Sequence, residues 1–197
     1  KKLNNNKNYS SFIIPAEELS MHNTKSQNIH ALILNNDKFL PGAGDGAEEP
    51  FNFSADYNTF NLYDNLEDKS ICIAAHPYTK VPFLQKIFFR RGSWHLDDIK
   101  PNKLAGLQIL NGAIDNEFYD SFNSWIKLLL NGYKKYIYAG NDAHGNFNIF
   151  RQIETPMLTI KEKKEQIFGH FKTAVLDVKN YKDINQLIDH LRFGNCF

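Results

Sequence analysis

Short apolar runs alternate with amphipathic stretches along most of this chain, and this alternation restricts the possible folds more than any other feature. The runs are rich in aromatic and β-branched residues and predict strands over residues 12–19, 29–35, 70–76, 104–111, 135–142 and 171–178. Apolar residues at helical spacing predict helices over residues 117–130, 161–168 and 184–191. Strands that alternate with helices are typical of a parallel α/β sheet or barrel.

The composition is that of one globular domain, which we assign to residues 12–197. In a chain of 197 residues, 42% hydrophobic and 14% aromatic residues are enough to build a substantial core. Residues 1–11 are polar and are expected to be the frayed end of a preceding segment, because Lys1 is not an initiator. Residues 35–68 predict a long loop with a short helix, which is either functional or a surface insertion.

Charge and cysteine usage exclude several classes of protein. The 23 basic and 22 acidic residues give a net charge of +1, so we expect neither a nucleic-acid nor a membrane partner. The expected partner is a small-molecule substrate. Cys72 and Cys196 are too few for a disulfide scaffold or a thiolate zinc site. No stretch is long and apolar enough for a membrane helix, which predicts a soluble protein whose compartment and oligomeric state stay open.

Polar side chains stand where the predicted strands begin or end. A Glu pair, Glu17 and Glu18, closes the first strand, and the run "YIYAGNDAHGN" ends in an acid and an imidazole. In a parallel α/β fold the carboxyl ends of the strands converge on one crevice. Histidine and carboxylate without cysteine suit zinc, manganese or iron, so we predict a site for such ions. The candidate ligands are Glu18, His30, His76, Asp142 and His144.

Each candidate also has a plainer interpretation. His76 taken alone is a strand-end histidine that bonds a backbone carbonyl, and His30 is a half-buried strand residue. Asp142 and His144 lie among turn-forming residues, and a turn can also aim ligands. Glu17 is expected to point away from Glu18, because neighbouring strand residues face opposite sides.

A basic segment provides candidate substrate contacts. Arg90, Arg91 and His95 lie within "RRGSWHLDDI", and a guanidinium group matches the geometry of a phosphate or carboxylate. We therefore predict that this segment contacts an anionic group of the substrate.

Five motifs in order resemble those of the PHP superfamily, named for polymerase and histidinol phosphatase domains. They are "IIPAEELS", "IHALILN", "CIAAHPY", "GLQILNG" and "WIKLLLNGYKKYIYAGNDAHG". The Glu pair, "LPGAGDGAEE" and the closing "LIDHLRFGNCF" resemble the CehA/McbA-like branch, which includes hydrolases of esters and carbamates. The resemblance covers roughly residues 12–197.

The resemblance implies a distorted (β/α)₇ barrel with two or three divalent metals at the carboxyl ends of its strands. It places Glu18 at the glutamate of the "PGxE" motif, His30 at the histidine that opens the next strand and His76 at the "AHP" histidine. Asp142 and His144 match the pair of the last motif. The opening His-x-His motif of the family has no counterpart here, so the resemblance also implies that the N-terminal strand or strands are missing from this chain.

The function expected from these observations is metal-dependent hydrolysis of phosphoester or ester-type bonds by a metal-activated water, with Asp142 and His144 as catalytic residues. One alternative is a noncatalytic PHP-like binding or structural module with an incomplete metal site. Another is a protein that binds metal without turnover.

Overall fold

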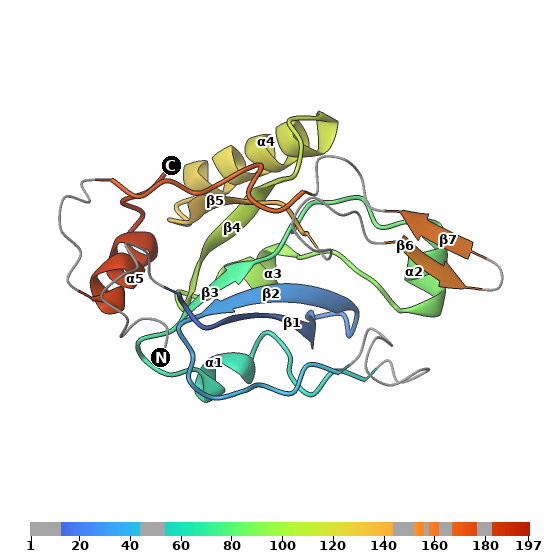
Figure 1. Ribbon diagram of the computed structural model, residues 1–197, viewed down its shortest axis with the longest axis horizontal. Coiled ribbons are helices and arrows are strands. Elements are labelled where there is room, and N and C mark those ends of the chain that lie inside the picture. The colour runs from blue at the N-terminus through green and yellow to red at the C-terminus, as the bar shows by residue number, and fades with distance from the viewer. Residues whose placement is uncertain (1–12, 44–53, 144–151, 156–157, 162–166, 177–182) are drawn as a thin grey trace.

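A mixed five-stranded sheet forms the centre of the computed structural model (Figure 1). The structure describes residues 13–43, 54–143, 152–155, 158–161, 167–176 and 183–197. The strands lie side by side in chain order: β1 (Ala16–His22), β2 (Asn28–Leu34), β3 (Ile71–Ala74), β4 (Leu104–Asn111) and β5 (Tyr136–Gly140). β2 pairs antiparallel with both β1 and β3, whereas β4 pairs parallel with both β3 and β5.

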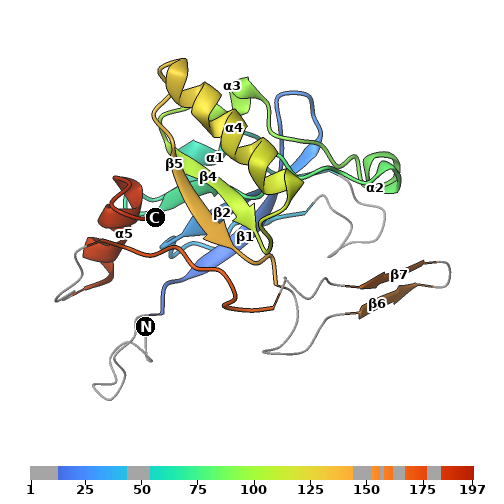
Figure 2. The same cartoon turned by 90° about the horizontal axis from the view of Figure 1, so that it is seen from above.

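The described helices are short apart from α4, which runs along β4 and β5 (Figures 1 and 2). They are α1 (Leu62–Asn65), α2 (Phe83–Phe88), α3 (Leu96–Ile99), α4 (Asn116–Leu130) and α5 (Ile184–Arg192). A separate hairpin pairs β6 (Gln152–Thr155) with β7 (Leu158–Lys161). The predicted helices over 117–130 and 184–191 are confirmed. None of the described helices combines the length and apolar character that a bilayer-crossing segment requires.

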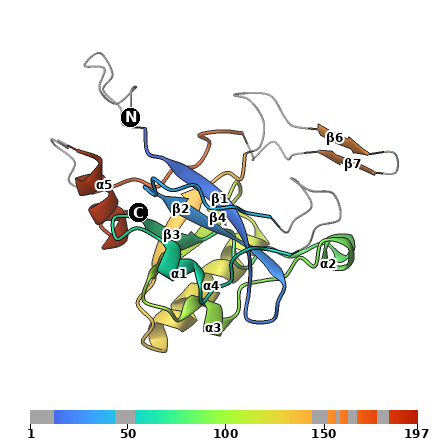
Figure 3. The same ribbon diagram turned by 90° about the horizontal axis from the view of Figure 1, so that it is seen from below.

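The two faces of the sheet bury separate cores. Alternate residues of β1 and β2, such as Leu19 and Ala31, join residues of α1, α3 and α4 in the larger core. On the other face, Ile71 and Ile73 of β3 pack against α5. Figure 3 shows α1, α3 and α4 together below the sheet and α5 at its side. Both faces are therefore covered at the α5 end, and the polar site described below lies elsewhere on the α5 face.

The turn between β1 and β2 determines their antiparallel pairing. The side-chain carbonyl of Asn23 accepts hydrogen bonds from the backbone N–H groups of Lys25 and Gln27, both at 2.9 Å, and Ser26 adopts a φ of 56°. Only residues 23–27 separate the two strands, and a parallel pair would need a crossover of about a dozen residues or more. A chain reversal over five residues therefore gives a hairpin.

The predicted (β/α)₇ barrel is wrong for the described part of the chain. The described strands form an open sheet with β1 and β5 at its edges, and the expectation of a parallel sheet holds only from β3 to β5. In the parallel half, α2 and α3 connect β3 to β4, and α4 connects β4 to β5. The antiparallel β1–β2–β3 pairing leaves no room for the alternating crossovers that close a barrel.

Two further element predictions are wrong. Residues 171–176 form no sixth strand; Val175 makes one isolated bridge with Cys196, and the Thr173 hydroxyl bonds the backbone N–H and carbonyl of Ala139 at 2.9 and 3.2 Å. The helix expected over 161–168 is contradicted at both ends, because Lys161 ends β7 and residues 167–170 form a turn. The long segment 35–68 contains α1, and residues 1–12 and 44–53 lie outside the described part of the chain.

Candidate metal centre

Glu18 and His30 lie in the middle of the β1–β2 hairpin and not at strand ends. Glu18 pairs with Leu32 and Ser20 pairs with His30, so the side chains of Glu18 and His30 are diagonal neighbours on one face. Leu19 follows Glu18 in β1, points to the opposite face of the sheet and is 2% exposed. Because side chains alternate between the two faces of a strand, Glu18 and His30 lie on the polar face, and the buried residues of the other face fix the β1–β2 register.

His76 reaches the same face from beyond the end of β3. The backbone N–H of Ala75 donates to the carbonyl of His30 at 3.1 Å, which continues the β2–β3 pairing past the last strand residue. His76 itself has a φ of 30°, a left-handed conformation that is costly for a residue with a side chain. Such strain at a polar side chain is typical of functional sites and aims the imidazole at the hairpin.

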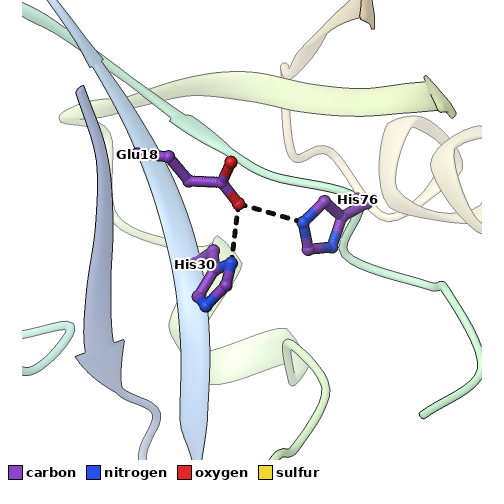
Figure 4. Close-up of side chains that lie close together, drawn as sticks. All are labelled: Glu18, His30 and His76. Carbon is purple, nitrogen blue, oxygen red and sulfur yellow. Dashed lines mark hydrogen bonds and ion pairs between the residues drawn. The ribbon is translucent and has the colours of Figure 1, made fainter. Parts of the chain in front are cut away.

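One carboxylate oxygen joins the three side chains (Figure 4). Glu18 Oε1 lies 2.6 Å from His30 Nδ1 and 3.1 Å from His76 Nε2. The two imidazole rings meet edge to face, with their centroids 5.6 Å apart. The side chains of His30 and His76 are 12% and 11% exposed, and that of Glu18 is 29% exposed. The Glu18–His30–His76 group is therefore largely shielded but still reachable from solvent.

Arg91 contacts this group through His30. Its guanidinium nitrogens lie 2.7 Å from His30 Nε2 and 3.1 Å from His30 Nδ1. The segment is held there because Asn28 bonds the backbone of Arg90 and Gly92, both at 2.9 Å. A Cβ atom on Gly92 would lie 2.5 Å from Gln27 Cβ, so glycine permits the close approach. Arg91 thus adds a positive charge beside the group.

The charges in the group are set by its neighbours. Burial opposes ionisation of Glu18, but hydrogen bonds from His30 and His76 outweigh it and hold the Glu18 pKa well below its ordinary value. Burial lowers the pKa of His30, and the charge of Arg91 adds to this effect against the opposing influence of Glu18. An anionic Glu18 beside a neutral His30 follows near neutral pH, and both are the forms that bind metal ions.

The three donors fit a divalent ion. Glu18, His30 and His76 are the one group of three or more potential ligands within the described residues, and their donor atoms lie within 4.8 Å of one another. Two donors of a tetrahedral ion, each about 2.0 to 2.2 Å from it, lie roughly 3.3 to 3.6 Å apart. Glu18 lies 2.6 Å from His30 and 3.1 Å from His76, so these separations would have to widen by roughly 0.2 to 1.0 Å around an ion. Metal binding by these residues stays a prediction.

Of the last two predicted ligands, Asp142 and His144, the structure describes only Asp142. Asp142 lies two residues beyond β5 with a φ of 50° and lines a pocket together with His76, but it is not in the Glu18–His30–His76 group. His144 lies outside the described residues. The pocket that Asp142 shares with His76 is therefore the observation that supports the sequence-based assignment of Asp142 as a ligand.

The other two predicted substrate contacts, Arg90 and His95, have other roles in the structure. Arg90 is exposed, with a φ of 49°, and its carbonyl accepts the bond from Asn28. His95 caps α3: its side chain accepts from the backbone N–H of Asp98, and its own N–H donates to the Asp98 carboxylate at 2.8 Å. Of the three, Arg91 is the residue in contact with the metal-ligand candidates.

Sequence reasoning missed the pocket beside His76. Its volume is about 120 Å³, and it lies among the carboxyl ends of β3, β4 and β5 and the first turns of α4. The lining residues are His76, Thr79, Gln108, Ile109, Asn111, Ala113, Asp115, Glu117, Phe118, Ser121 and Asp142. The signal available was Gln108, a polar residue inside the otherwise apolar run "LAGLQILN".

Comparisons of this chain with models of protein families, with characterised proteins and with solved structures give no match.

Proposed function

We propose that this chain is a metal-dependent hydrolase that binds a divalent ion through Glu18, His30 and His76 and cleaves phosphoester or ester bonds. The observation that carries the proposal is the meeting of these three donors on one polar face. A bound divalent ion would supply a water with a pKa near 7, and hence a nucleophile at neutral pH. The resemblance of the motifs to the PHP superfamily supports the hydrolase class, although not its barrel.

The number of donors favours catalysis over a structural metal. Structural zinc sites are closed by four protein ligands, whereas catalytic sites keep three, often two histidines and a glutamate, and leave a position for water. The described residues provide two histidines and one glutamate. This composition supports the enzyme over a purely structural module.

The surrounding residues have proposed roles that match the chemistry. Arg91, 2.7 Å from His30, is placed to neutralise an anionic oxygen of the substrate. Asp142, in the pocket that His76 also lines, is proposed to accept or return a proton or to complete the ligand set. His144, two residues after Asp142, is proposed as a catalytic residue and metal ligand, as the sequence predicts.

The test combines metal content with turnover. The purified chain is loaded with zinc or manganese, its metal is measured by elemental analysis, and it is assayed on p-nitrophenyl phosphate, bis-p-nitrophenyl phosphate and p-nitrophenyl acetate. We expect about one ion per chain and turnover of at least one substrate, both lost in His76→Ala. Bound metal without turnover would leave a metal-binding protein, and absence of both would leave a noncatalytic module.

A further inference from the structure

The helix α2 and the residue after it carry an exposed apolar surface. The side chains of Phe83, Ile87, Phe88 and Phe89 are 73%, 56%, 60% and 38% exposed, and none of these four described residues belongs to either core. Exposed apolar side chains that lie together on a globular protein mark a place where another molecule binds.

Basic side chains accompany this apolar surface, and acidic ones do not. Residues 77–96 contain Lys80, Lys86, Arg90 and Arg91, whereas none of the 22 acidic residues of the chain lies in this range. Lys86 and Arg90 are exposed, and among the described residues neither forms an ion pair. The net charge of +1 is therefore an average that includes a local concentration of positive charge at α2.

These apolar and basic side chains form one surface, the α2 surface, which consists of Phe83, Lys86, Ile87, Phe88, Phe89 and Arg90. In Figures 2 and 3, α2 lies beyond the sheet, at the end of two extended connections. The second connection is fixed to β2, because the side-chain amide of Asn28 donates to the carbonyl of Phe89 at 2.9 Å. The indole N–H of Trp94 also donates to the carbonyl of His30, at 3.1 Å. The α2 surface is therefore held at a fixed place outside the sheet.

Apolar side chains interleaved with cations match the chemistry of an anionic lipid surface. Phenylalanine and isoleucine enter the boundary between headgroups and acyl chains, while lysine and arginine approach the anionic headgroups. Two copies of this chain match less well, because a two-fold contact would bring Lys86 and Arg90 against their own equivalents. An extended peptide binds in a groove or along a sheet edge, and α2 is a projecting helix.

We propose that the α2 surface binds an anionic membrane, with its apolar side chains inserted between the lipids and with Lys86 and Arg90 at the headgroups. This proposal differs from the expectation drawn from the net charge, because attraction to a membrane depends on the charges within a Debye length of about 8 to 10 Å from it. Arg91 follows the α2 surface directly and lies 2.7 Å from His30. Membrane binding thus brings the candidate metal centre near the lipids.

Co-sedimentation with vesicles tests the proposal. The full chain is mixed with vesicles of phosphatidylcholine alone, or of phosphatidylcholine with about 30% phosphatidylserine as the anionic lipid. EDTA is present, so that bound ions cannot bridge protein and lipid. We expect partitioning to the anionic vesicles to be at least about tenfold stronger, and to weaken when NaCl rises from about 0.1 M to about 0.5 M.

Phe83→Ser and Lys86→Gln separate the apolar and the charged contributions. Phe83→Ser should weaken partitioning to the anionic vesicles at least about tenfold, because an inserted aromatic side chain is lost. Lys86→Gln should weaken it about fivefold, the contribution of one basic residue near an anionic surface. Leu130→Ser and Lys127→Gln are the matched controls at exposed positions of α4, and both should bind within about twofold of the unchanged chain.

Equal partitioning to both kinds of vesicle, or equal losses in the α2 variants and their α4 controls, would overturn the proposal. Absence of vesicle binding would also overturn it, and two further measurements would then identify the partner. A dimer that light scattering detects and that Phe83→Ser dissociates would assign the α2 surface to a second copy of this chain. Binding of poly-glutamate that Lys86→Gln weakens would assign it to an acidic protein. None of these outcomes depends on hydrolase activity.

Discussion

The antiparallel and parallel halves of the sheet supply polar groups to the candidate site in different ways. In the β1–β2 hairpin, Glu18 and His30 stand in mid-strand, where paired backbone on a buried core fixes their spacing. In the parallel half, His76 and Asp142 stand beyond the ends of β3 and β5, in left-handed conformations. The hairpin therefore offers a preformed donor pair, and the parallel half offers donors on loops.

The two halves therefore differ in how precisely they hold a side chain and in how readily they adjust to a ligand. Side chains on regular strands are held more precisely than side chains on loops, and loops can adjust to a ligand. We therefore expect the hairpin to define the ion position and the parallel half to define what is bound beside it.

Trp125→Ala should destabilise the parallel half without changing the metal centre. Trp125 packs between α4 and the sheet, and its indole N–H donates to the carbonyl of Lys135 at 2.7 Å. Because the ring is only partly buried, we expect a loss of about 3 kcal/mol in unfolding free energy, at the lower end for such truncations. Urea unfolding measures the loss, and zinc affinity should stay unchanged.

Leu130→Ala is the matched control on the same helix. Leu130 is 82% exposed, so its truncation should change stability by less than about 0.5 kcal/mol. A fall in zinc affinity caused by Trp125→Ala would show that the two halves are coupled.

Glu18→Gln should remove most metal binding, because it deletes the anionic donor that contacts both histidines. Loss of a partner that merely supports a ligand costs roughly 10- to 100-fold in metal affinity, so loss of a direct donor should cost at least about 100-fold. Zinc titration by calorimetry measures the change. Glu17→Gln is the adjacent control and should leave the affinity within about threefold, because Glu17 faces away in the strand. Equal losses in both variants would contradict the assignment.

Arg91→Gln should weaken binding of anionic substrates and raise the pKa of His30. The charge of Arg91 contributes, after burial, to the lowered pKa of that imidazole. Loss of one charge-assisted hydrogen bond of about 1.5 kcal/mol corresponds to roughly a tenfold rise in KM for a phosphoester, with little change for a neutral ester. NMR titration follows the imidazole.

Arg90→Gln makes the same change one residue earlier. Burial and then the charge of Arg90 lower the pKa of His22, so this variant should raise the pKa of His22 and leave that of His30 unchanged. A shift of His30 in both variants would mean that Arg91 has no specific role.

Acid should weaken the metal-free hairpin in two steps. The pKa of His30 is lowered on folding, so the unfolded chain takes up its proton first and stability falls as the pH drops below about 6.5. The pKa of Glu18 is also lowered, and its contribution is lost as the pH falls below about 4.5 towards the lower folded value. Thermal melts from pH 8 to 3 should show Glu18→Gln lacking the second step. An identical pH profile for the variant would contradict it.

The sequence predicted the elements of the fold better than their assembly. Apolar periodicity correctly located the strands around Ile71 and Leu104 and the helix around Trp125. It could not determine strand direction, because an apolar run has the same pattern in either direction. The five-residue link 23–27 did indicate that β1 and β2 run antiparallel, since so short a link cannot join parallel neighbours.

For the site, residue type was a better guide than position. Glu18, His30 and His76 were predicted to lie together, and they do, although the expected cause, convergence of parallel strand ends, applies only to His76. Gln108 and Glu117 were not predicted, because nothing in the local sequence shows that β4 and the start of α4 enclose a common space. That juxtaposition is a property of tertiary packing.

Thr173 has a consequence for how the sheet meets other chains. A strand at a sheet edge presents unpaired N–H and carbonyl groups that another chain can join, which promotes aggregation. On β5, the Thr173 hydroxyl occupies both the N–H and the carbonyl of Ala139, near the end of this edge strand. One side chain thereby protects part of this edge against strand addition without extending the sheet.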